Sequence, residues 1–550
     1  MDLCEEGFGE PDGPVCRGIL GDCHVMRGGK KMRRKGIAQV VLAILVLSLS
    51  GLEAGVAQTQ PKRGGILTVG TNADVNGVDP HTNTAVPNAV VLHHVFESLI
   101  SYGDQFEFVP TLAERWKIEP DYKTYTFFLR KGKLFHNGRE MEANDVKYSI
   151  ERMLDPKTGS GFRSHFETID HIDVMDRYTV RVHMKKADAG LLYKLAYNNP
   201  IIAIVPREEI EKQGGVFKHP VGTGPFKFVE WKPDRYVLLE RFGQYKPQLG
   251  PINGMGGERI PYLDKVKFVP IAEGEVATMA LLNREIDFLL QVPFESVERF
   301  KKDYAKKGIV LDEIPGDAWY QIWFGCKQPI TKDVKFRQAC AYAIDQEMVA
   351  MAATRGYSVI NSSFVGTKNV YFTPAHSKWY KKDVTKAKEL LKECGYKGEP
   401  VTLFTSKKYK MMYDQAVAVQ AELSSVGVNI KLEVVDLPVL VNKYVTGDYQ
   451  ILSFGVAAKP DPVAAYIILK QNQFEDQYPR MKELMAQASA TLDFETRKKL
   501  FEEAHQIVYE GVPCINFYHY YYFNAYWNNV KGFKMLPTNM PRFWGVWLAS

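Results

Sequence analysis

Cysteine is scarce in this chain, whose 550 residues include seven, and only four of these follow residue 60. The four are Cys326, Cys340, Cys394 and Cys514. They form no Cys-x-x-Cys pair and show no metal-ligand spacing, which excludes the common zinc and dithiol motifs. Cys340 and Cys394 stand in helical patterns where small buried residues belong, so we expect core thiols, while the sequence leaves disulfide pairing open.

Short catalytic motifs are also missing. The sequence contains no Gly-x-Ser-x-Gly elbow, no His-Glu-x-x-His and no nucleotide-binding loop. The turn at Gly222 and Gly224 lacks the third glycine of a dinucleotide fingerprint, and Pro225 would block the helix start that such a site needs. We therefore predict no catalytic residue, no cofactor and no metal. A secreted hydrolase stays an alternative, because the paired carboxylates of glycoside chemistry leave no short signature.

Long runs of charge and of apolar residues are absent as well. The formal net charge is only +6, and no long basic run follows Arg63, which argues against nucleic acid as a partner. The apolar segment 40–47 is far shorter than the roughly 20 residues of a membrane-spanning helix.

That apolar segment instead fits an export signal. Basic residues precede it and small residues occupy 55–57, so we place the cleavage after Ala57 and predict a periplasmic protein. No cysteine lies at the junction, so we expect no stable membrane anchor. Such signals are N-terminal, which indicates that residues 1–25 precede the true start, at Met26 or Met32. Residues 1–57 are thus predicted to be leader and signal peptide.

Strands and helices alternate along the rest of the first half. The pattern predicts strands at 65–70, 125–130 and 266–270, helices at 88–99 and 275–283, and a strand-rich segment at 172–184. Asn144 looks like the N-cap of a further helix that carries Val146, Ile150 and Met153 on one face. This half is predicted to be one α/β unit with a strand-rich insertion.

The second half alternates more regularly. Asp383 is predicted to cap a helix that ends at Cys394, and helices at 411–427 and 437–446 separate strands at 401–405, 428–434 and 449–454. Such alternation predicts a parallel sheet with right-handed crossovers. The chain is therefore predicted to form two α/β lobes. Ligands in such folds bind beyond the carboxyl ends of strands, so a cleft between the lobes is the default site.

Motifs in a fixed order resemble the family 5 extracytoplasmic solute-binding proteins of ABC importers, whose members bind dipeptides, oligopeptides or nickel. The matching stretches are LAERW at 112–116, TYTFFLRKG at 124–132, FHNG at 135–138, ANDVKYS at 143–149, VGTGPF at 221–226 and DVKFRQA at 333–339. Order and spacing agree over essentially the whole chain after the signal. The two glycines of VGTGPF are expected to serve the bend before the strand that starts at Phe226.

The resemblance implies a two-lobed periplasmic binding protein fold, type II-like, with an extra strand-rich subdomain in the first lobe. We expect the first lobe to comprise 58–316 and 525–550, with the subdomain at about 98–220, and the second lobe to comprise 317–524. The resemblance further implies a monomer that delivers a small solute to the transmembrane subunits of an ABC permease, and no enzyme.

One segment of the sequence bears on how the charged end of a ligand would be held. Peptide binders of this family hold the ligand's ammonium group with an aspartate shortly before an Asp-Pro pair. Here that position is Ala458, with Lys459 beside it and Asp461 in the pair. A buried ammonium group without a counter-ion is costly. We therefore expect a non-peptidic solute, anionic, carbonyl-bearing or aromatic, and Lys459 as a contact; Asp461 would cap or pin the loop.

Aromatic residues supply the other candidate contacts. Trp319 and Tyr320 lie on opposite faces of a strand that enters the second lobe, and one face must join the core. Tyr520 belongs to an aromatic run, 517–527, that we otherwise expect to pack in the core. Phe454 ends a predicted strand. Asp74 and Val75, in the loop after the first strand, match a segment that lines the family's pocket.

Peptides and nickel chelates remain alternative ligands at this stage. Nickel-chelate transport would require a histidine in the cleft, for which His376 or His519 could serve. His93 and Glu97 have the four-residue spacing of metal ligands on a helix, but no third ligand is near, so we predict an ordinary packed helix there.

Overall fold

A computed structural model describes residues 60–83, 85–197, 201–457 and 459–549. The chain divides into two units, Met1–Gln60 and Pro61–Ser550, and the account below concerns the second. The predicted leader, its cleavage site after Ala57 and the alternative starts at Met26 and Met32 lie outside the described residues, as does Ala458.

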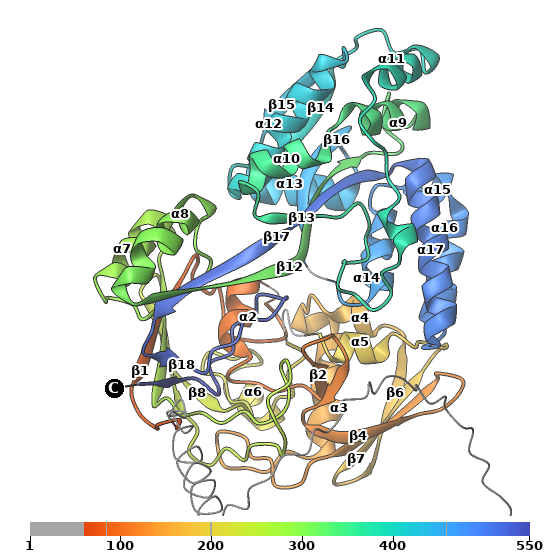
Figure 1. Ribbon diagram of the computed structural model, residues 1–550. Coiled ribbons are helices and arrows are strands. Elements are labelled where there is room, and N and C mark those ends of the chain that lie inside the picture. Colours follow the sequence, from red (N-terminus) through yellow and green to blue (C-terminus); the bar gives the residue numbers. More distant parts are fainter. Residues whose placement is uncertain (1–59, 84, 198–200, 458, 550) are drawn as a thin grey trace, which may run out of the picture. The chain divides into compact units, whose positions relative to one another are not determined.

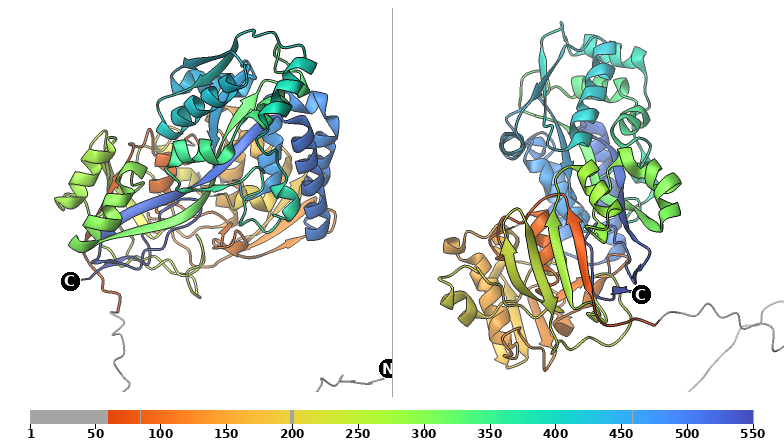
Figure 2. Two further views of the ribbon diagram at one scale, coloured as in Figure 1. Left: turned by 45° about the horizontal axis from the view of Figure 1, so that its top comes forward. Right: turned by 90° about the vertical axis from the view of Figure 1, so that its left-hand side faces the viewer.

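One large mixed sheet runs through the second unit, in the order β15-β14-β16-β12-β17-β11-β1-β10-β9-β8, with β13 added to β17 (Figure 1). Its two central strands, β12 (Ile309–Phe324) and β17 (Cys514–Trp527), are antiparallel partners. They cross the molecule as a pair of long ribbons, best seen in the left view of Figure 2. The predicted lobe boundaries at 316 and 525 fall inside these two strands.

The first lobe has its own hydrophobic core, which includes Leu67, Phe226 and Val266. Strand β1 pairs in parallel with β10 and β11, and β9 and β8 extend the sheet antiparallel, as the right view of Figure 2 shows. The strands are β1 (Ile66–Thr71), β8 (Phe226–Lys232), β9 (Tyr236–Arg241), β10 (Lys265–Pro270) and β11 (Phe288–Leu289), with a small pair β18 (Val530–Lys531) and β19 (Trp547–Leu548). The helices are α2 (Val86–Leu92), α6 (Arg207–Lys212), α7 (Gly274–Leu282) and α8 (Phe294–Arg299).

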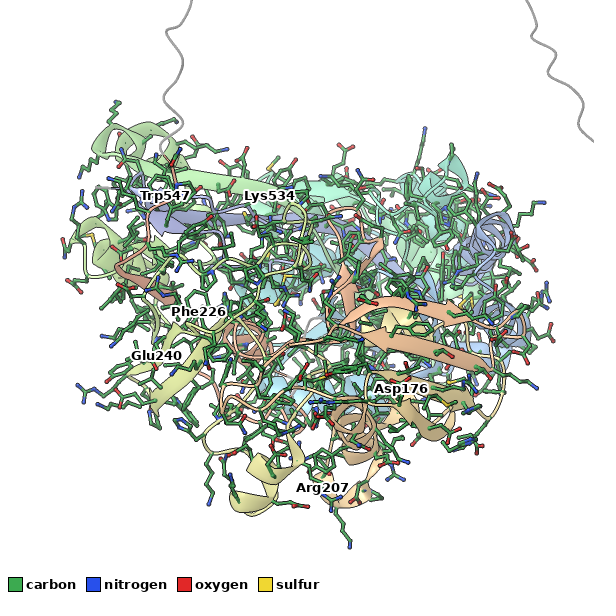
Figure 3. The ribbon with its side chains drawn as sticks, turned by 90° about the horizontal axis from the view of Figure 1, so that it is seen from below. Asp176, Arg207, Phe226, Glu240, Lys534 and Trp547 are labelled. Carbon is green, nitrogen blue, oxygen red and sulfur yellow. The ribbon has the colours of Figure 1, made fainter. Side chains whose placement is uncertain are left out.

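A separate four-stranded sheet, in the order β4-β5-β7-β6, forms what we call the subdomain. Helix α3 (Ala143–Leu154) buries Val146 and Ile150 against Val180 and Val182 of this sheet, so only the other sheet face meets solvent. Figure 3 shows it from below, with Asp176 at the end of β6, well apart from Phe226 and Glu240. Its elements are β4 (Ala113–Ile118), β5 (Thr124–Leu129), β6 (Ile169–Asp176), β7 (Thr179–Met184), α4 (Arg163–Phe166) and α5 (Leu191–Leu195), beside the pair β2 (Ile100–Tyr102) and β3 (Phe108–Pro110).

The second lobe packs around a third core, which includes Trp323, Leu403 and Val419. Strand β14 pairs in parallel with both β15 and β16, while β16 meets β12 antiparallel. The strands are β13 (Ser358–Ile360), β14 (Val401–Thr405), β15 (Ile430–Val434) and β16 (Ile451–Val456). The helices are α9 (Val334–Ala343), α10 (Gln346–Thr354), α11 (Val384–Glu393), α12 (Lys410–Ser425), α13 (Leu437–Thr446), α14 (Pro462–Tyr466), α15 (Phe474–Gln477), α16 (Pro479–Ser489) and α17 (Phe494–Gly511).

The helix predicted at 88–99 is present as α2, but it ends at Leu92, so the predicted C-terminal end is wrong. The backbone of His94 and Val95 serves another segment: the N–H groups of Gly224 and Phe226 donate to the carbonyl oxygens of Val95 and His94, at 2.9 and 3.1 Å respectively. A Cβ on Gly224 would lie 2.4 Å from the carbonyl oxygen of His94. The glycine turn is thus needed for close approach of two backbones, rather than for the sharp bend that we expected.

Two further expectations need correction. The N-cap of α3 is Glu142 rather than Asn144, and its N–H donates to the Asp145 carboxylate at 2.8 Å. The sheet of the second half is mixed rather than parallel, because β12 and β17 add antiparallel strands to the three parallel ones.

The four cysteines of the described part are unpaired. Cys326, Cys340 and Cys514 are buried, and burial raises the pKa of Cys326 to about 11, which keeps its thiol protonated. Among the described helices, none combines the length and hydrophobicity that crossing a bilayer requires.

Candidate functional site

A cavity of about 950 Å³ lies along β12 and β17 and receives residues from both lobes. The first lobe contributes the segment 72–73 after β1 and the segment 291–295, and the second contributes 408–414 after β14 and 454–457 at the end of β16. The last two segments follow the carboxyl ends of parallel strands, where ligands of α/β sheets bind. Seven of the lining residues are aromatic: Phe294, Tyr320, Tyr409, Phe454, Tyr520, Tyr521 and Tyr522.

Tyr320 is fixed by its neighbours on both sides of β12. It pairs with Tyr518 on β17, the two rings stacking with centroids 5.9 Å apart, and with Gly455 on β16. A Cβ on Gly455 would lie 2.7 Å from the Tyr320 ring. The absence of a side chain at Gly455 therefore leaves room for the Tyr320 ring to lie across β16. Part of this ring lines the cavity.

Two more rings continue this wall. The centroid of Tyr520 lies 5.6 Å from that of Tyr320 and 4.9 Å from that of Tyr522. Phe454 stacks on Tyr444 at 4.6 Å, which leaves its other side toward the cavity. Burial raises the pKa of Tyr520 to about 12, so its hydroxyl stays neutral and can donate a hydrogen bond to a ligand.

Charged residues also line the cavity, and the two carboxylates among them have cationic partners. Asp414 forms an ion pair with Lys410, and Glu295 lies 4.0 Å from Arg355. Lys408, which also lines the cavity, makes no side-chain hydrogen bond or ion pair with any residue that the structure describes. The described lining therefore carries one positive charge more than negative.

Three of the predicted contacts lie behind this lining. Trp319 is only 2 % exposed and packs against Phe364 and His519. The Asp74 carboxylate accepts hydrogen bonds from the indole N–H of Trp231 at 3.1 Å and from the backbone N–H of Asp234 at 2.7 Å. Val75 is buried in the first core. Asn72 and Ala73, just before them, line the cavity instead.

Lys459 lies apart from the cavity. Its ammonium nitrogen is 5.5 Å from the ring centroid of Tyr197, which belongs to the subdomain side of the chain. Ala457 reaches the lining, whereas Ala458 is not described. Asp461 caps α14, accepting from the N–H of Val463 at 3.1 Å, and forms a buried ion pair with Arg497. It pins the loop, as we expected.

The histidines considered for metal chelates do not line the cavity. The ring of His376 bonds to Thr373 at 3.1 Å, and His519 bonds to Asn361 at 2.6 Å, both in buried surroundings. His93 follows the end of α2, and its ring bonds to the carbonyl oxygen of Pro541 at 2.8 Å. Glu97 is buried with Lys133 and accepts a hydrogen bond from the Tyr245 hydroxyl at 2.8 Å.

Several lining residues were missed in the sequence, although signals for them existed. Tyr522 follows Tyr520 by two positions on one strand, so both side chains point to the same face. Lys408 and Tyr409 come directly after the strand at 401–405, where the rule for parallel sheets places ligands. Phe294 and Arg355 had no such local signal in the sequence. They lie at the ends of helices α8 and α10, and only the packing of these helices brings them to the cavity.

Comparisons with known proteins agree on one family. The model of "Bacterial extracellular solute-binding proteins, family 5 Middle" matches residues 107–476. The chain is 30 % identical over 395 residues, 69 % of this chain and 71 % of the relative, to the "Putative ABC transporter peptide-binding protein" of Brucella ovis.

Solved structures share the fold. The ABC transporter-associated periplasmic binding protein DppA of Helicobacter pylori, in complex with the peptide STSA, matches with a TM-score of 0.75 and 26 % identity, covering 89 % of this chain and 99 % of that one. AgaA of A. tumefaciens R10, in complex with agropinic acid, matches with a TM-score of 0.74 and 24 % identity, covering 88 % and 99 %. Since the family model spans more than half of the chain, this protein belongs to the family 5 bacterial extracellular solute-binding proteins, the solute-binding components of ABC importers.

Proposed function

We propose that the cavity captures a small, non-peptidic organic solute that carries an anionic or carbonyl group and a planar part. The protein would act in the periplasm after removal of residues 1–57, as a monomer without cofactor or catalytic activity, and would pass the solute to the transmembrane subunits of an ABC permease. The family supports the importer role, and the names of periplasmic relatives support the compartment.

The charge balance of the lining is the observation that carries this proposal. A peptide brings an ammonium group, which needs a carboxylate when it is buried. Asp414 and Glu295 already have Lys410 and Arg355 beside them, whereas Lys408 has no such partner within the described residues. An anionic ligand would pair with Lys408. A cationic ligand would have to compete with Lys410 or Arg355 for a carboxylate.

The aromatic wall supports a planar group. Tyr320, Phe454 and Tyr520 offer ring faces, and the two tyrosines also offer phenol hydroxyls, so we propose all three as ligand contacts. Micromolar affinity requires about 8 kcal/mol, which a few buried rings and hydrogen bonds can supply. Trp319, Asp74 and Val75 would act by holding the segments that carry the lining residues. Contact with Lys459 stays a prediction.

Matched ligands test the proposal directly. Calorimetry would compare organic acids, opines and glycosides with di- to pentapeptides, each peptide with a free or an acetylated N-terminus. We expect binding of an organic acid, opine or glycoside, and no tight binding of peptides with a free ammonium group. Tight peptide binding that acetylation abolishes, with no binding of the other solutes, would overturn the proposal in favour of the peptide ligands that the relatives' names indicate.

The role of the unpaired cation can be tested separately. Lys408→Gln should weaken binding of an anionic solute by about tenfold, the effect of losing one charge-assisted hydrogen bond. Lys407→Gln is the matched control, because Lys407 is exposed next to it but does not line the cavity. Equal affinities of the two variants would contradict a role for Lys408. Turnover of the solute by the purified protein would instead indicate the hydrolase alternative.

A further inference from the structure

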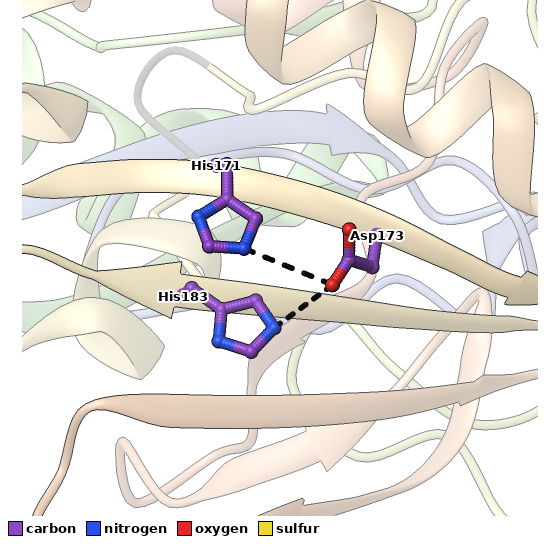
Figure 4. A group of neighbouring side chains, drawn as sticks. All are labelled: His171, Asp173 and His183. Carbon is purple, nitrogen blue, oxygen red and sulfur yellow. Dashed lines mark hydrogen bonds and ion pairs between the residues drawn. The ribbon is translucent and has the colours of Figure 1, made fainter.

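Two histidines and an aspartate, none of which lines the cavity, meet on the solvent face of the subdomain. His171 on β6 and His183 on β7 are direct partners in the antiparallel ladder. Asp173 follows His171 by two positions, so its side chain leaves the same face of β6. Figure 4 shows the Asp173 carboxylate beside the two imidazoles, with one of its oxygens directed at a nitrogen of each ring.

The spacing of the three donor atoms suits a metal ion. The Asp173 Oδ2 atom is 3.1 Å from His183 Nε2 and 3.7 Å from His171 Nε2, and one ligand atom from each residue lies within 4.8 Å of the others. In a tetrahedral zinc site with bonds near 2.0 Å, ligand atoms are about 3.3 Å apart. Small side-chain rotations would therefore bring all three atoms into one coordination sphere.

The orientation of the rings is already set. The two imidazoles stack with centroids 4.3 Å apart and an interplanar angle of 9°, so they reach outward side by side. The Nδ1 atom of His171 lies 2.9 Å from Asp170 Oδ2. A carboxylate on Nδ1 holds the proton there and leaves Nε2 as the free ligand atom, the arrangement found behind metal-binding histidines.

The surroundings leave the site open to an ion from solution. The side chains of His171 and Asp173 are about half exposed, at 54 % and 51 %, and that of His183 is 26 % exposed. The cation that faces Asp173 in the ladder is Arg181, but its Nε donates to Thr126 Oγ1 at 3.4 Å. No ion pair between Asp173 and Arg181 would therefore have to break when a metal ion binds.

We propose that His171, Asp173 and His183 form a surface site for a divalent ion of the late first-row metals, such as Zn²⁺ or Cu²⁺. Two imidazole nitrogens and one carboxylate oxygen are the donor set that such ions prefer over Mg²⁺ or Ca²⁺. Three protein ligands leave a fourth position to water or a further ligand. The ion would tie β6, the edge strand of its sheet, to β7. The site is independent of solute capture in the cavity.

Titration of the tag-free mature protein tests this proposal. After treatment with a chelator, we expect calorimetry with Zn²⁺ to show one saturable site per chain. His171→Asn, His183→Asn and Asp173→Asn should each weaken Zn²⁺ binding at least about tenfold, because each removes one of three ligands. The electron paramagnetic resonance spectrum of the protein with one equivalent of Cu²⁺ should show two imidazole nitrogens.

Controls separate the site from general histidine chemistry and from unfolding. His219→Asn changes another exposed histidine, which lies in a loop outside the cluster, and should leave Zn²⁺ affinity unchanged. All variants should keep the thermal midpoint of the metal-free protein. Absence of saturable binding, equal affinity of the ligand variants and the parent, or a copper spectrum without imidazole nitrogens would each overturn the proposal. None of these results depends on the solute.

Discussion

Among the described residues, two of the ring pairs that stack across antiparallel strands differ chiefly in burial. Tyr320 and Tyr518 are partners across β12 and β17, with an interplanar angle of 17°. His171 and His183 are partners across β6 and β7, with an angle of 9°. Both ring pairs are nearly parallel, but Tyr320 is 7 % exposed and the His171 side chain 54 %.

Burial decides what each pair can bind. The tyrosines lie where strands of both lobes meet, and burial raises their pKa values, so both hydroxyls stay neutral. Tyr320 lines the cavity, where we propose that it contacts an organic solute, while Tyr518 supports its ring from behind. The histidines lie on a solvated sheet face, where ring nitrogens and carboxylates are free to accept an ion. The carboxylates of the two regions differ as well. Those that line the cavity, Asp414 and Glu295, have a cationic side chain beside them, whereas those of β6 are exposed to solvent.

The largest expected effect concerns a carboxyl group of β12 itself. Asp317 is 8 % exposed, near Lys368 and His519 in a cavity of about 10 Å³, and burial raises its pKa from 3.8 to about 7. The folded protein then keeps a proton that the unfolded chain releases, so Asp317 costs stability as the pH rises from about 4 to 7. Asp317→Asn should increase the free energy of unfolding at pH 8, on the order of a few kcal/mol, and should have no effect near pH 3.

The exposed strand supplies the opposite case. A hydrogen bond from the backbone N–H of Tyr178 lowers the pKa of Asp176, at the end of β6. This group stabilises the fold above the pKa of the unfolded chain, and the contribution is lost as the pH falls. Asp176→Asn should therefore slightly destabilise the protein at pH 8. Urea unfolding at several pH values measures both variants, and effects of the same sign would contradict the comparison.

Gly455 tests how strictly the buried ring pair is placed. In Gly455→Ala the new methyl group would meet the Tyr320 ring at 2.7 Å, so the ring must move. Overpacking of this kind costs about 1–3 kcal/mol, and we expect solute affinity to fall by about ten- to a hundredfold. The control is Gly243→Ala, since a Cβ there meets no atom within 4 Å and the backbone is not left-handed. Unchanged affinity in Gly455→Ala would remove Tyr320 from the site.

The smallest of these effects concerns a single ring face. Phe454→Ala should weaken solute binding by about tenfold, the loss of one stacking contact and its buried area. Phe404→Ala is the matched control: Phe404 is also half-buried, lies on the neighbouring strand β14 and does not line the cavity. Calorimetry measures the solute affinity of both variants. A larger loss of affinity in Phe404→Ala than in Phe454→Ala would show that the solute does not contact Phe454.

The regular part of the fold was predictable because its signals are local. Asp383 caps α11 as expected, and α13 has the predicted bounds. The end of the helix predicted at 88–99 was wrong for the converse reason: the carbonyl oxygens of His94 and Val95 accept hydrogen bonds from a turn more than 120 residues away. Apolar periodicity does not record such a partner.

The candidate site was predictable only in part. Tyr320, Phe454 and Tyr520 reach the cavity, while Trp319, on the other face of the same strand, belongs to the core. Alternation showed that the two faces of β12 differ, but it could not tell which face meets the cavity. The group His171, Asp173 and His183 escaped notice because its members are recognisable only once the register of β6 and β7 is known.

The sequence by itself determined the family, the order of most strands and helices, and the aromatic character of the central strands, because these depend on local patterns and ordered motifs. Tertiary structure decided which aromatic faces meet in the cavity, which carboxylates already have a cation beside them, and which histidines become neighbours. Those properties depend on pairing between distant segments. Burial shifts the pKa values of side chains and decides which of their polar atoms can reach a ligand. A side chain becomes buried only when these distant segments have paired.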